Sequence, residues 1–250
     1  MSVEGLGKDF CGAIIPDNFF PIEKLRNYTQ MGLIRDFAKG SAVIMPGEEI
    51  TSMIFLVEGK IKLDIIFEDG SEKLLYYAGG NSLIGKLYPT GNNIYATAME
   101  PTRTCWFSEK SLRTVFRTDE DMIFEIFKNY LTKVAYYARQ VAEMNTYNPT
   151  IRILRLFYEL CSSQGKRVGD TYEITMPLSQ KSIGEITGVH HVTVSRVLAC
   201  LKRENILDKK KNKIIVYNLG ELKHLSEQTS YYSDPNSSSV DKLAAALDHH

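Results

Sequence analysis

The chain has 250 residues, of which 44% are hydrophobic and 24% are charged, and its Lys and Arg residues balance its Asp and Glu residues. This is the composition of a globular protein, and the length allows two domains with separate cores. No apolar run approaches the roughly 20 residues needed to span a bilayer, and the first residues, MSVEGLGKDF, lack the features of a signal peptide, so we expect a cytoplasmic protein.

The charges are unevenly distributed along the chain. Residues 1–147 contain 16 Lys and Arg against 19 Asp and Glu, whereas residues 148–230 contain 13 against 8. A basic C-terminal third suggests a polyanionic partner, although an excess of five charges can also be simple solvation. Residues 237–250 look like a vector-encoded linker and the start of a histidine tag, so we exclude them from the fold prediction.

Short β-type runs alternate with turn signals from residue 39 to residue 107. Glycines punctuate this region about every ten residues, and the segment EDGSE is a strong hairpin signal. The pattern predicts a small antiparallel barrel or sandwich.

Apolar residues then recur at alternating spacings of 4 and 3 along one long helical pattern. The spacing follows a period of 3.5 rather than 3.6 over about three heptads, which favours a coiled coil between two chains. The alternative is a long helix that packs on its own barrel. The predicted dimer seam consists of Ile123, Phe127, Tyr130, Val134, Tyr137, Val141 and Met144.

A second domain is predicted after a hinge at the segment YNPT, where Pro149 ends the long helix and Thr150 begins a new one as its N-cap. The pattern continues with a helix to about Ser163, a strand around YEITMP, and two short helices between Ser179 and Asn205. A β-hairpin with the turn DKKKNK follows. This order predicts a winged helix-turn-helix.

The two short helices carry an internal apolar stripe, and Gly188 lies in the turn between them. On the second helix the opposite face carries His191, Val192, Ser195 and Arg196, which suits reading of base edges in the major groove. The alternative is a helix-turn-helix that binds no nucleic acid, which the basic wing disfavours. The residues predicted to contact phosphates are Lys202, Arg203, Lys209, Lys210, Lys211 and Lys213.

From about residue 36 to residue 222 the sequence resembles the transcription regulators typified by the cyclic-AMP receptor protein and the fumarate-and-nitrate-reduction regulator. The resemblance rests on the order of barrel, long helix and winged helix, with SIGEITGVHHVTVSR as the sharpest motif. It implies an α+β fold with three parts: an effector-sensing antiparallel β-barrel, a jelly roll of the cyclic-nucleotide-binding type, at 1–117; a dimerisation helix at 118–147; and a DNA-binding winged helix-turn-helix at 148–232. Within the superfamily the chain looks close to regulators that switch on reductive dehalogenation genes in halorespiring bacteria in response to ortho-chlorinated phenols.

Relatives that bind cyclic nucleotides hold the cyclic phosphate with a Gly-Glu-Leu turn followed by an Arg-Ser pair. In this chain the turn consists of Gly85, Lys86 and Leu87, and the later segment NNIYATAME has no arginine. The phosphate clamp is therefore missing. We do not expect cyclic-nucleotide binding, and the change from Glu to Lys points to a different anion.

The sequence supports no metal site. Cys11 stands alone near the N-terminus, with Cys105, Cys161 and Cys200 scattered behind it, so no loop supplies the ligands of an iron–sulfur cluster. All five histidines lie at or after His190, outside the predicted barrel, which excludes haem and cupin-type metal chemistry there. We predict no metal, no cofactor and no catalytic activity.

The region that matches the relatives' ligand pocket is aromatic and cationic. A lysine near the dimer seam has a desolvation cost unless it is paired, and an anionic aromatic ligand would pair it. A halogenated phenol fits, because ring halogens lower the phenol's pKa and favour a phenolate that a lysine can hold. The alternatives are core or seam packing for each tyrosine and a solvated turn for Lys86. The predicted effector site consists of Tyr76, Gly85, Lys86, Tyr88, Tyr130 and Lys133, with Tyr77 beside them in the same region.

The resemblance also bears on the DNA sequence that is read. In the fumarate-and-nitrate-reduction relatives a Glu, a Ser and an Arg read a TTGAT-type half-site, and the matching positions here are Val192, Ser195 and Arg196. A carboxylate accepts a hydrogen bond from the cytosine amino group, whereas valine suits a thymine methyl. We therefore predict a TTAAT-like inverted repeat.

Together these inferences predict a homodimeric, ligand-gated transcription activator whose partners are double-stranded DNA, a halogenated phenol and RNA polymerase. Two alternatives stay open: a redox-sensing regulator without a small ligand, and a metal-free barrel enzyme acting on an aromatic acid. The redox candidates are Cys11 and Cys200, the latter within the recognition-helix pattern. Four reduced cysteines are ordinary in the cytosol, which favours an inert role for them.

Overall fold

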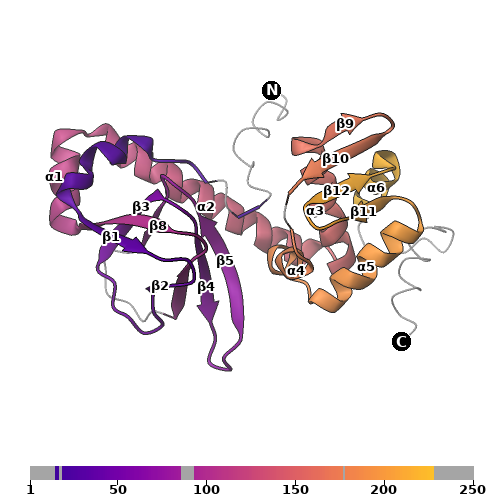
Figure 1. Ribbon diagram of the computed structural model, residues 1–250, viewed down its shortest axis with the longest axis horizontal. Helices are drawn as coiled ribbons and strands as arrows, with labels where there is room; N and C mark the ends of the chain where they lie inside the picture. The colour runs from indigo at the N-terminus through magenta and orange to yellow at the C-terminus, as the bar shows by residue number, and fades with distance from the viewer. Residues whose placement is uncertain (1–14, 17–18, 86–92, 177, 228–250) are drawn as a thin grey trace. The chain divides into compact units, whose positions relative to one another are not determined.

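A computed structural model describes residues 15–16, 19–85, 93–176 and 178–227 of the chain (Figure 1). The chain divides into two compact units, Met1–Tyr137 and Ala138–His250. One long helix, α2 (Asp121–Thr146), contributes residues to both units.

The first unit is built on two four-stranded antiparallel sheets. One sheet has the strand order β1-β8-β3-β6 and the other has the order β2-β7-β4-β5. This arrangement confirms the predicted antiparallel fold, as a two-sheet sandwich of jelly-roll type rather than a closed barrel. The strands are β1 (Leu33–Phe37), β2 (Ala42–Ile44), β3 (Ser52–Glu58), β4 (Ile61–Ile66), β5 (Glu72–Ala78), β6 (Leu83–Gly85), β7 (Ile94–Ala98) and β8 (Thr102–Ser108).

The hairpin signal EDGSE forms the turn between β4 and β5, which pair along their length (Figure 1). The amide of Phe67 donates to the carbonyl of Ser71 at 2.9 Å, and the amide of Gly70 donates back to the carbonyl of Phe67 at 2.9 Å. Gly70 has a φ of 78°, a left-handed conformation that a glycine adopts without a steric cost. The carboxylate of Asp69 accepts from the amide of Ser71, which closes the turn.

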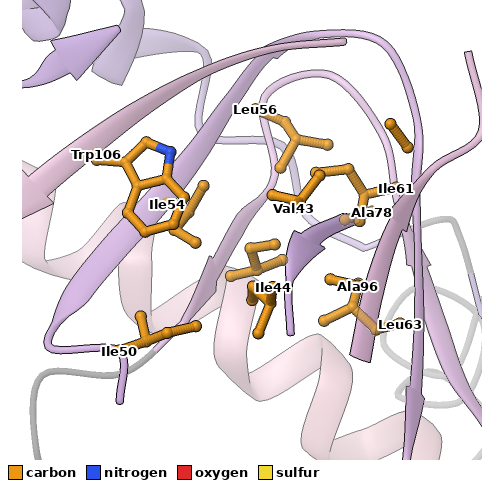
Figure 2. Packing of buried hydrophobic residues seen from close by; sticks show 12 residues of the cluster. Val43, Ile44, Ile50, Ile54, Leu56, Ile61, Leu63, Ala78, Ala96 and Trp106 are labelled. Carbon is orange, nitrogen blue, oxygen red and sulfur yellow. The ribbon is translucent and has the colours of Figure 1, made fainter. Parts of the chain in front are cut away.

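The main core lies between the two sheets, where aliphatic side chains from both inner faces meet (Figure 2). Ile54 and Leu56 of β3 face Ile61 and Leu63 of β4 in this cluster, and Trp106 closes it from β8. Each fully buried side chain of this size stabilises the fold by roughly 1.5–3 kcal/mol.

Strand β3 is buried on both faces, which explains its continuous apolar run MIFLV. Its alternate residues Met53 and Phe55 point into a second cluster, where they pack with Phe107 of β8. Helical residues cover this cluster, among them Leu25 of the 3-10 helix η2 (Glu23–Met31) and Leu112 of α1 (Glu109–Thr118).

The second unit is a winged helix-turn-helix, which confirms the predicted order of elements. It contains α3 (Pro149–Gln164), α4 (Gln180–Thr187), α5 (His191–Arg203) and α6 (Leu219–Glu227). Its sheet has the order β11-β12-β10-β9, and its strands are β9 (Lys166–Val168), β10 (Thr171–Thr175), β11 (Leu207–Lys209) and β12 (Lys213–Val216).

The structure corrects the start of α3. The predicted N-cap was Thr150, but the N-cap is Asn148, whose side-chain oxygen accepts from the amide of Ile151 at 2.9 Å. Pro149 is the first residue of the helix, where its missing N–H leaves no hydrogen bond unmade. The proline therefore opens α3, while α2 ends at Thr146.

Candidate effector site and DNA-reading helix

Lys133 lies in the first unit on the face of α2 that packs against the sandwich, and only 5% of it is exposed. Its Nζ donates a hydrogen bond to the carbonyl of Leu83 in β6 at 2.5 Å. One turn earlier, the hydroxyl of Tyr130 donates to the carbonyl of Gly85 at 3.4 Å. These two contacts join α2 to the end of β6.

Three aromatic rings surround the Lys133 ammonium, and we call Phe19, Tyr76 and Tyr130 the aromatic cage. Nζ lies 4.8 Å from the ring centre of Tyr130, 5.0 Å from that of Tyr76 and 5.9 Å from that of Phe19. The faces of aromatic rings carry negative charge density, so the cage attracts the charged form of the lysine.

Burial sets the charge state of this site. Within the part of the chain that the structure describes, no carboxylate lies within ion-pair distance of Lys133, and desolvation lowers the pKa of Lys133 to about 7. Burial, followed by the neighbouring Tyr130 and Tyr137, raises the pKa of Tyr76 above its ordinary value. The site therefore holds a lysine whose charged form is destabilised by burial beside a tyrosine that keeps its proton.

Four of the six residues predicted for the effector site are brought together: Tyr76, Gly85, Tyr130 and Lys133. Lys86 and Tyr88 lie outside the described residues. Tyr77 takes the opposite face of β5, as strand alternation requires, and its ring lies beneath Nζ of Lys60 at 5.0 Å.

Sequence reasoning missed Phe19 in this site. The ring of Phe19 meets that of Tyr76 edge-on with centres 5.4 Å apart, and only 6% of the residue is exposed. Phe19 precedes every periodic segment of the sequence, so neither a helical nor a strand period could have assigned it. Chemically, the cage and its lysine offer a buried cation within an aromatic wall, which suits an aromatic anion.

In the second unit the turn and helix of the reading motif have the predicted form. Gly188 adopts a left-handed conformation, with φ at 64°, and caps α4, while the side chain of His190 caps α5. Val194, Val197, Leu198 and Leu201 are buried, which confirms the predicted internal stripe.

The opposite face of α5 is exposed to solvent. His191, Val192, Ser195 and Arg196 are all exposed, Val192 by 42%. A single exposed valine is ordinary on a protein surface, and here its methyl groups are available for apolar contact with a partner.

The lysines predicted to contact phosphates differ in their surroundings. Nζ of Lys202 forms an ion pair with Asp208 at 3.2 Å, which ties the end of α5 to β11. Lys210 and Lys211 lie exposed in the turn between β11 and β12. These two lysines therefore present their charge to solvent, whereas Nζ of Lys213 forms an ion pair with Glu173 at 2.5 Å.

The apolar positions of α2 divide between two faces of the helix. Tyr130 packs against the second core cluster and the hydroxyl of Tyr137 is buried, so these two predicted seam residues face inward. Phe124 and Leu131, which the predicted seam omits, are exposed by 65% and 53%. The exposed apolar stripe, spaced by three and four residues, consists of Phe124, Phe127, Leu131, Val134, Ala138 and Val141.

Cys200 lies on the buried face of α5, where Nη2 of Arg203 donates to its Sγ at 3.3 Å. Burial raises the pKa of Cys200, while the positive charge of Arg203 opposes that effect. Burial also raises the pKa values of Cys105 and Cys161 to about 11. Cys11 lies outside the described residues.

Two negative findings apply to the described ranges alone. Within them no group of three His, Cys, Asp or Glu side chains is placed to hold a metal ion. None of their helices combines the length and the apolar character needed to cross a membrane.

Both units match models of known protein families. Residues 34–119 match the cyclic nucleotide-binding domain, and residues 151–225 match the Crp-like helix-turn-helix domain.

Individual proteins extend this similarity over most of the chain. A structure of CprK with the C200S substitution, complexed with OCPA, is 98% identical, covers 88% of this chain and all of that one, and superposes with a TM-score of 0.81. Oxidized CprK in complex with o-chlorophenolacetic acid is 96% identical over 99% of this chain and all of that one, with a TM-score of 0.52. The global nitrogen regulator of Synechocystis sp. is 23% identical over 191 residues, which are 74% of this chain and 85% of that protein.

The identities of 98% and 96%, over 88% and 99% of this chain, agree with the two matching domains. This chain belongs to the Crp/FNR family, whose members are transcription regulators and not enzymes.

Proposed function

We propose that this chain is a cytoplasmic, homodimeric transcription activator that responds to an ortho-halogenated phenol and switches on reductive dehalogenation genes. The phenol oxygen binds at Lys133 within the aromatic cage. The effector needs no metal or cofactor, and its binding controls how well the two reading helices of a dimer fit DNA.

One observation carries the proposal: a lysine that is 5% exposed, has a pKa of about 7 and has three aromatic rings around its ammonium group. Such a lysine gains a partner when an anion binds, and a charge-assisted hydrogen bond contributes roughly 1.5–3 kcal/mol. Halogens make the phenol more acidic and add apolar surface, so one substituent strengthens both the hydrogen bond to Lys133 and the contact with the aromatic rings.

The similarity to CprK supports the choice of ligand. Structures of that protein, at 98% and 96% identity to this chain, contain OCPA or o-chlorophenolacetic acid. Lys86 and Tyr88, which follow Gly85 in the sequence, are proposed to complete the site, with Lys86 as a second cation for the anionic ligand.

The dimer is proposed to form through the exposed apolar stripe of α2. Its side chains repeat at spacings of three and four, the pattern that buries a seam between two helices. Six apolar side chains in one line would otherwise stay in water, which is uncommon in a monomer.

The DNA site is proposed to be a TTAAT-like inverted repeat read by His191, Val192, Ser195 and Arg196. The exposure of Val192 supports this assignment, because its methyl groups are available for a thymine methyl. Lys202, Lys210 and Lys211 are proposed to contact phosphates, and RNA polymerase is the proposed partner of the DNA-bound dimer.

Calorimetric titration of the full chain tests the ligand assignment directly. We expect o-chlorophenolacetic acid to bind more tightly than hydroxyphenylacetic acid, which lacks the chlorine, and Lys133→Met to weaken binding by at least about tenfold, which is roughly 1.4 kcal/mol. Equal affinity for the two acids, or unchanged affinity in Lys133→Met, would contradict the proposal. Turnover of either acid would instead support the alternative of a barrel enzyme.

A further inference from the structure

A short segment that precedes η2, residues 19–22, is attached to α2 by two side chains. The amide of Phe20 donates to Oγ1 of Thr132 at 3.1 Å, and Nδ2 of Asn129 donates to the carbonyl of Phe20 at 2.6 Å. Both backbone groups of one residue are thus bound by residues more than a hundred positions away. We call this pair of contacts the latch.

The latch is built into the interior of the first unit. Asn129 is fully buried, and within the described part of the chain its Oδ1 has no hydrogen-bond partner. Burying Oδ1 without a partner destabilises the fold. The amide of Asn129 therefore forms its bond to Phe20 while its other end remains unsatisfied. The segment is also fixed at its other end, where the amide of Ile22 donates to the carbonyl of Asn81 at 2.8 Å.

The latch fixes the backbone of the residue that follows Phe19. This ring packs edge-on against Tyr76, with centres 5.4 Å apart, and against Tyr136, with centres 6.0 Å apart. Tyr76 belongs to β5 and Tyr130 to α2, so the sandwich and the long helix fix them. Phe19 is the one cage ring that belongs to neither a strand nor a helix, and it is next in sequence to the residue that the latch binds.

The cage rings lie around the atom that would bind the phenol oxygen. An oxygen bound to Lys133 would lie about 2.8 Å from Nζ, and an ortho substituent is attached to the carbon next to the one that carries this oxygen. The ring centres of the cage lie 4.8–5.9 Å from the same Nζ. A halogen at that position would therefore come close to the cage rings.

We propose that Phe19 determines how large an ortho substituent the effector site accepts, and that Asn129 and Thr132 are positioning residues that hold Phe19 in place. The inference rests on the proposed function, since it takes the phenol oxygen to bind at Lys133. It assigns the selectivity to a residue outside both the sheets and the long helix.

The test compares two ligands by calorimetry on the full chain: o-chlorophenolacetic acid, and its analogue with chlorine at both positions beside the hydroxyl. Phe19→Ala removes the ring that limits the size of the ortho substituent. The ratio of the affinities for the dichloro and monochloro acids should therefore shift by about tenfold or more in favour of the dichloro acid. Phe19→Leu, which keeps more of the core, should shift the ratio in the same direction by less. Phe20→Leu is the matched control, because its ring contacts Lys128 and lies outside the cage.

The latch is tested on the same ratio. Thr132→Val removes the acceptor for Phe20 with little change in volume and should shift the ratio in the direction of Phe19→Ala, whereas Thr132→Ser keeps the hydroxyl and should retain the parent ratio. A purely structural role would weaken the binding of both acids equally and leave the ratio unchanged.

Each failure has a separate signature. A parent that binds neither acid would contradict the proposed function, and the inference with it. A parent that binds o-chlorophenolacetic acid, but whose ratio stays constant in Phe19→Ala and Phe19→Leu, would overturn the inference and leave the proposed function standing. A shift in the Phe19 variants without one in Thr132→Val would support Phe19 and remove the role of the latch.

Discussion

At the scale of single residues, Lys133 shows how one buried charge links folding to pH. In the unfolded chain a lysine has a pKa of about 10.4, whereas burial lowers that of Lys133 to about 7. Between these values the unfolded state binds more protons, so the free energy of unfolding rises with pH. Below about pH 7 the lysine is charged in both states, and its desolvation destabilises the folded protein by at most about 5 kcal/mol.

Replacing this lysine by a neutral side chain should therefore remove a pH-dependent cost. We predict that Lys133→Met is more stable than the parent at about pH 6 and that this advantage shrinks as the pH rises toward about 10. Urea unfolding followed by the fluorescence of Trp106, the single tryptophan, reports on the same unit. A stability difference that is the same at every pH would show that the burial of Lys133 does not perturb its titration.

Val192 is the residue that should set which base pair is read. Val192→Glu restores a carboxylate that can accept from a cytosine amino group, so it should move preference from TTAAT toward TTGAT half-sites by about 1–3 kcal/mol. Competition binding between the two palindromes at one fixed salt concentration measures this. If the glutamate variant shows the parent's preference, Val192 does not face the bases.

At the scale of elements, the exposed stripe of α2 predicts which substitution separates the dimer. Val134 is 61% exposed and lies near the middle of the stripe. In Val134→Asp two carboxylates would be buried near each other at the seam, which should weaken dimerisation by about 3–5 kcal/mol. Sedimentation should show monomers for this variant and dimers for Val134→Leu, and a Val134→Asp protein that still sediments as a dimer would place the interface elsewhere.

In the helix-turn-helix, the backbone of Gly184 lies so close to the backbone of Val189 that a side chain at position 184 does not fit. Gly220, in the same unit, has room for a side chain and serves as the comparison. A Cβ on Gly184 of α4 would lie 2.5 Å from the carbonyl oxygen of Val189, whereas one on Gly220 of α6 would meet its nearest atom at 3.6 Å. Gly184→Ala should lower the free energy of unfolding by about 1–3 kcal/mol through overpacking. Gly220→Ala should raise it by up to about 1 kcal/mol, since alanine favours the helix. Denaturant unfolding followed by circular dichroism compares them, and the same sign for both would contradict the close approach.

The elements that could be predicted from sequence are those with one unambiguous period. The reading helix was such a case, because its buried stripe of Val194, Val197 and Leu201 stands against a polar face. Helix α2 was harder, since it is apolar on two faces. Tyr130 packs inward and Leu131 outward, and one heptad count cannot separate these two overlapping registers.

The residues of the candidate site were likewise predictable only where a sequence pattern assigns a side chain to one face. The sequence does not distinguish Tyr76 from its neighbour Tyr77. Which of the two rings contacts Lys133 depends on which face of β5 is turned toward α2. Phe19 was beyond prediction, because its neighbour Phe20 is held by Asn129 and Thr132 through contacts that are made only in the folded chain.

At the scale of the whole molecule, the proposed response has to pass from α2 to the reading helix. Within the second unit the end of α2 is bound to α3 by charged side chains. Arg139 forms ion pairs with Glu143 at 3.0 Å and with Glu159, and Arg155 lies 4.3 Å from the ring centre of Tyr147. The C-terminal part of α2 and the middle of α3 are therefore joined by charged side chains. An effector that binds α2 differently in two states would shift the population of dimers whose reading helices fit DNA.

The most direct test of this account is the affinity of the full chain for a TTAAT inverted repeat, with and without o-chlorophenolacetic acid. At one fixed salt concentration we predict that the acid raises the DNA affinity of the parent by at least about tenfold, and that Lys133→Met keeps its basal DNA affinity but loses this response. The same DNA affinity with and without the acid in the parent, or a full response in Lys133→Met, would contradict the account.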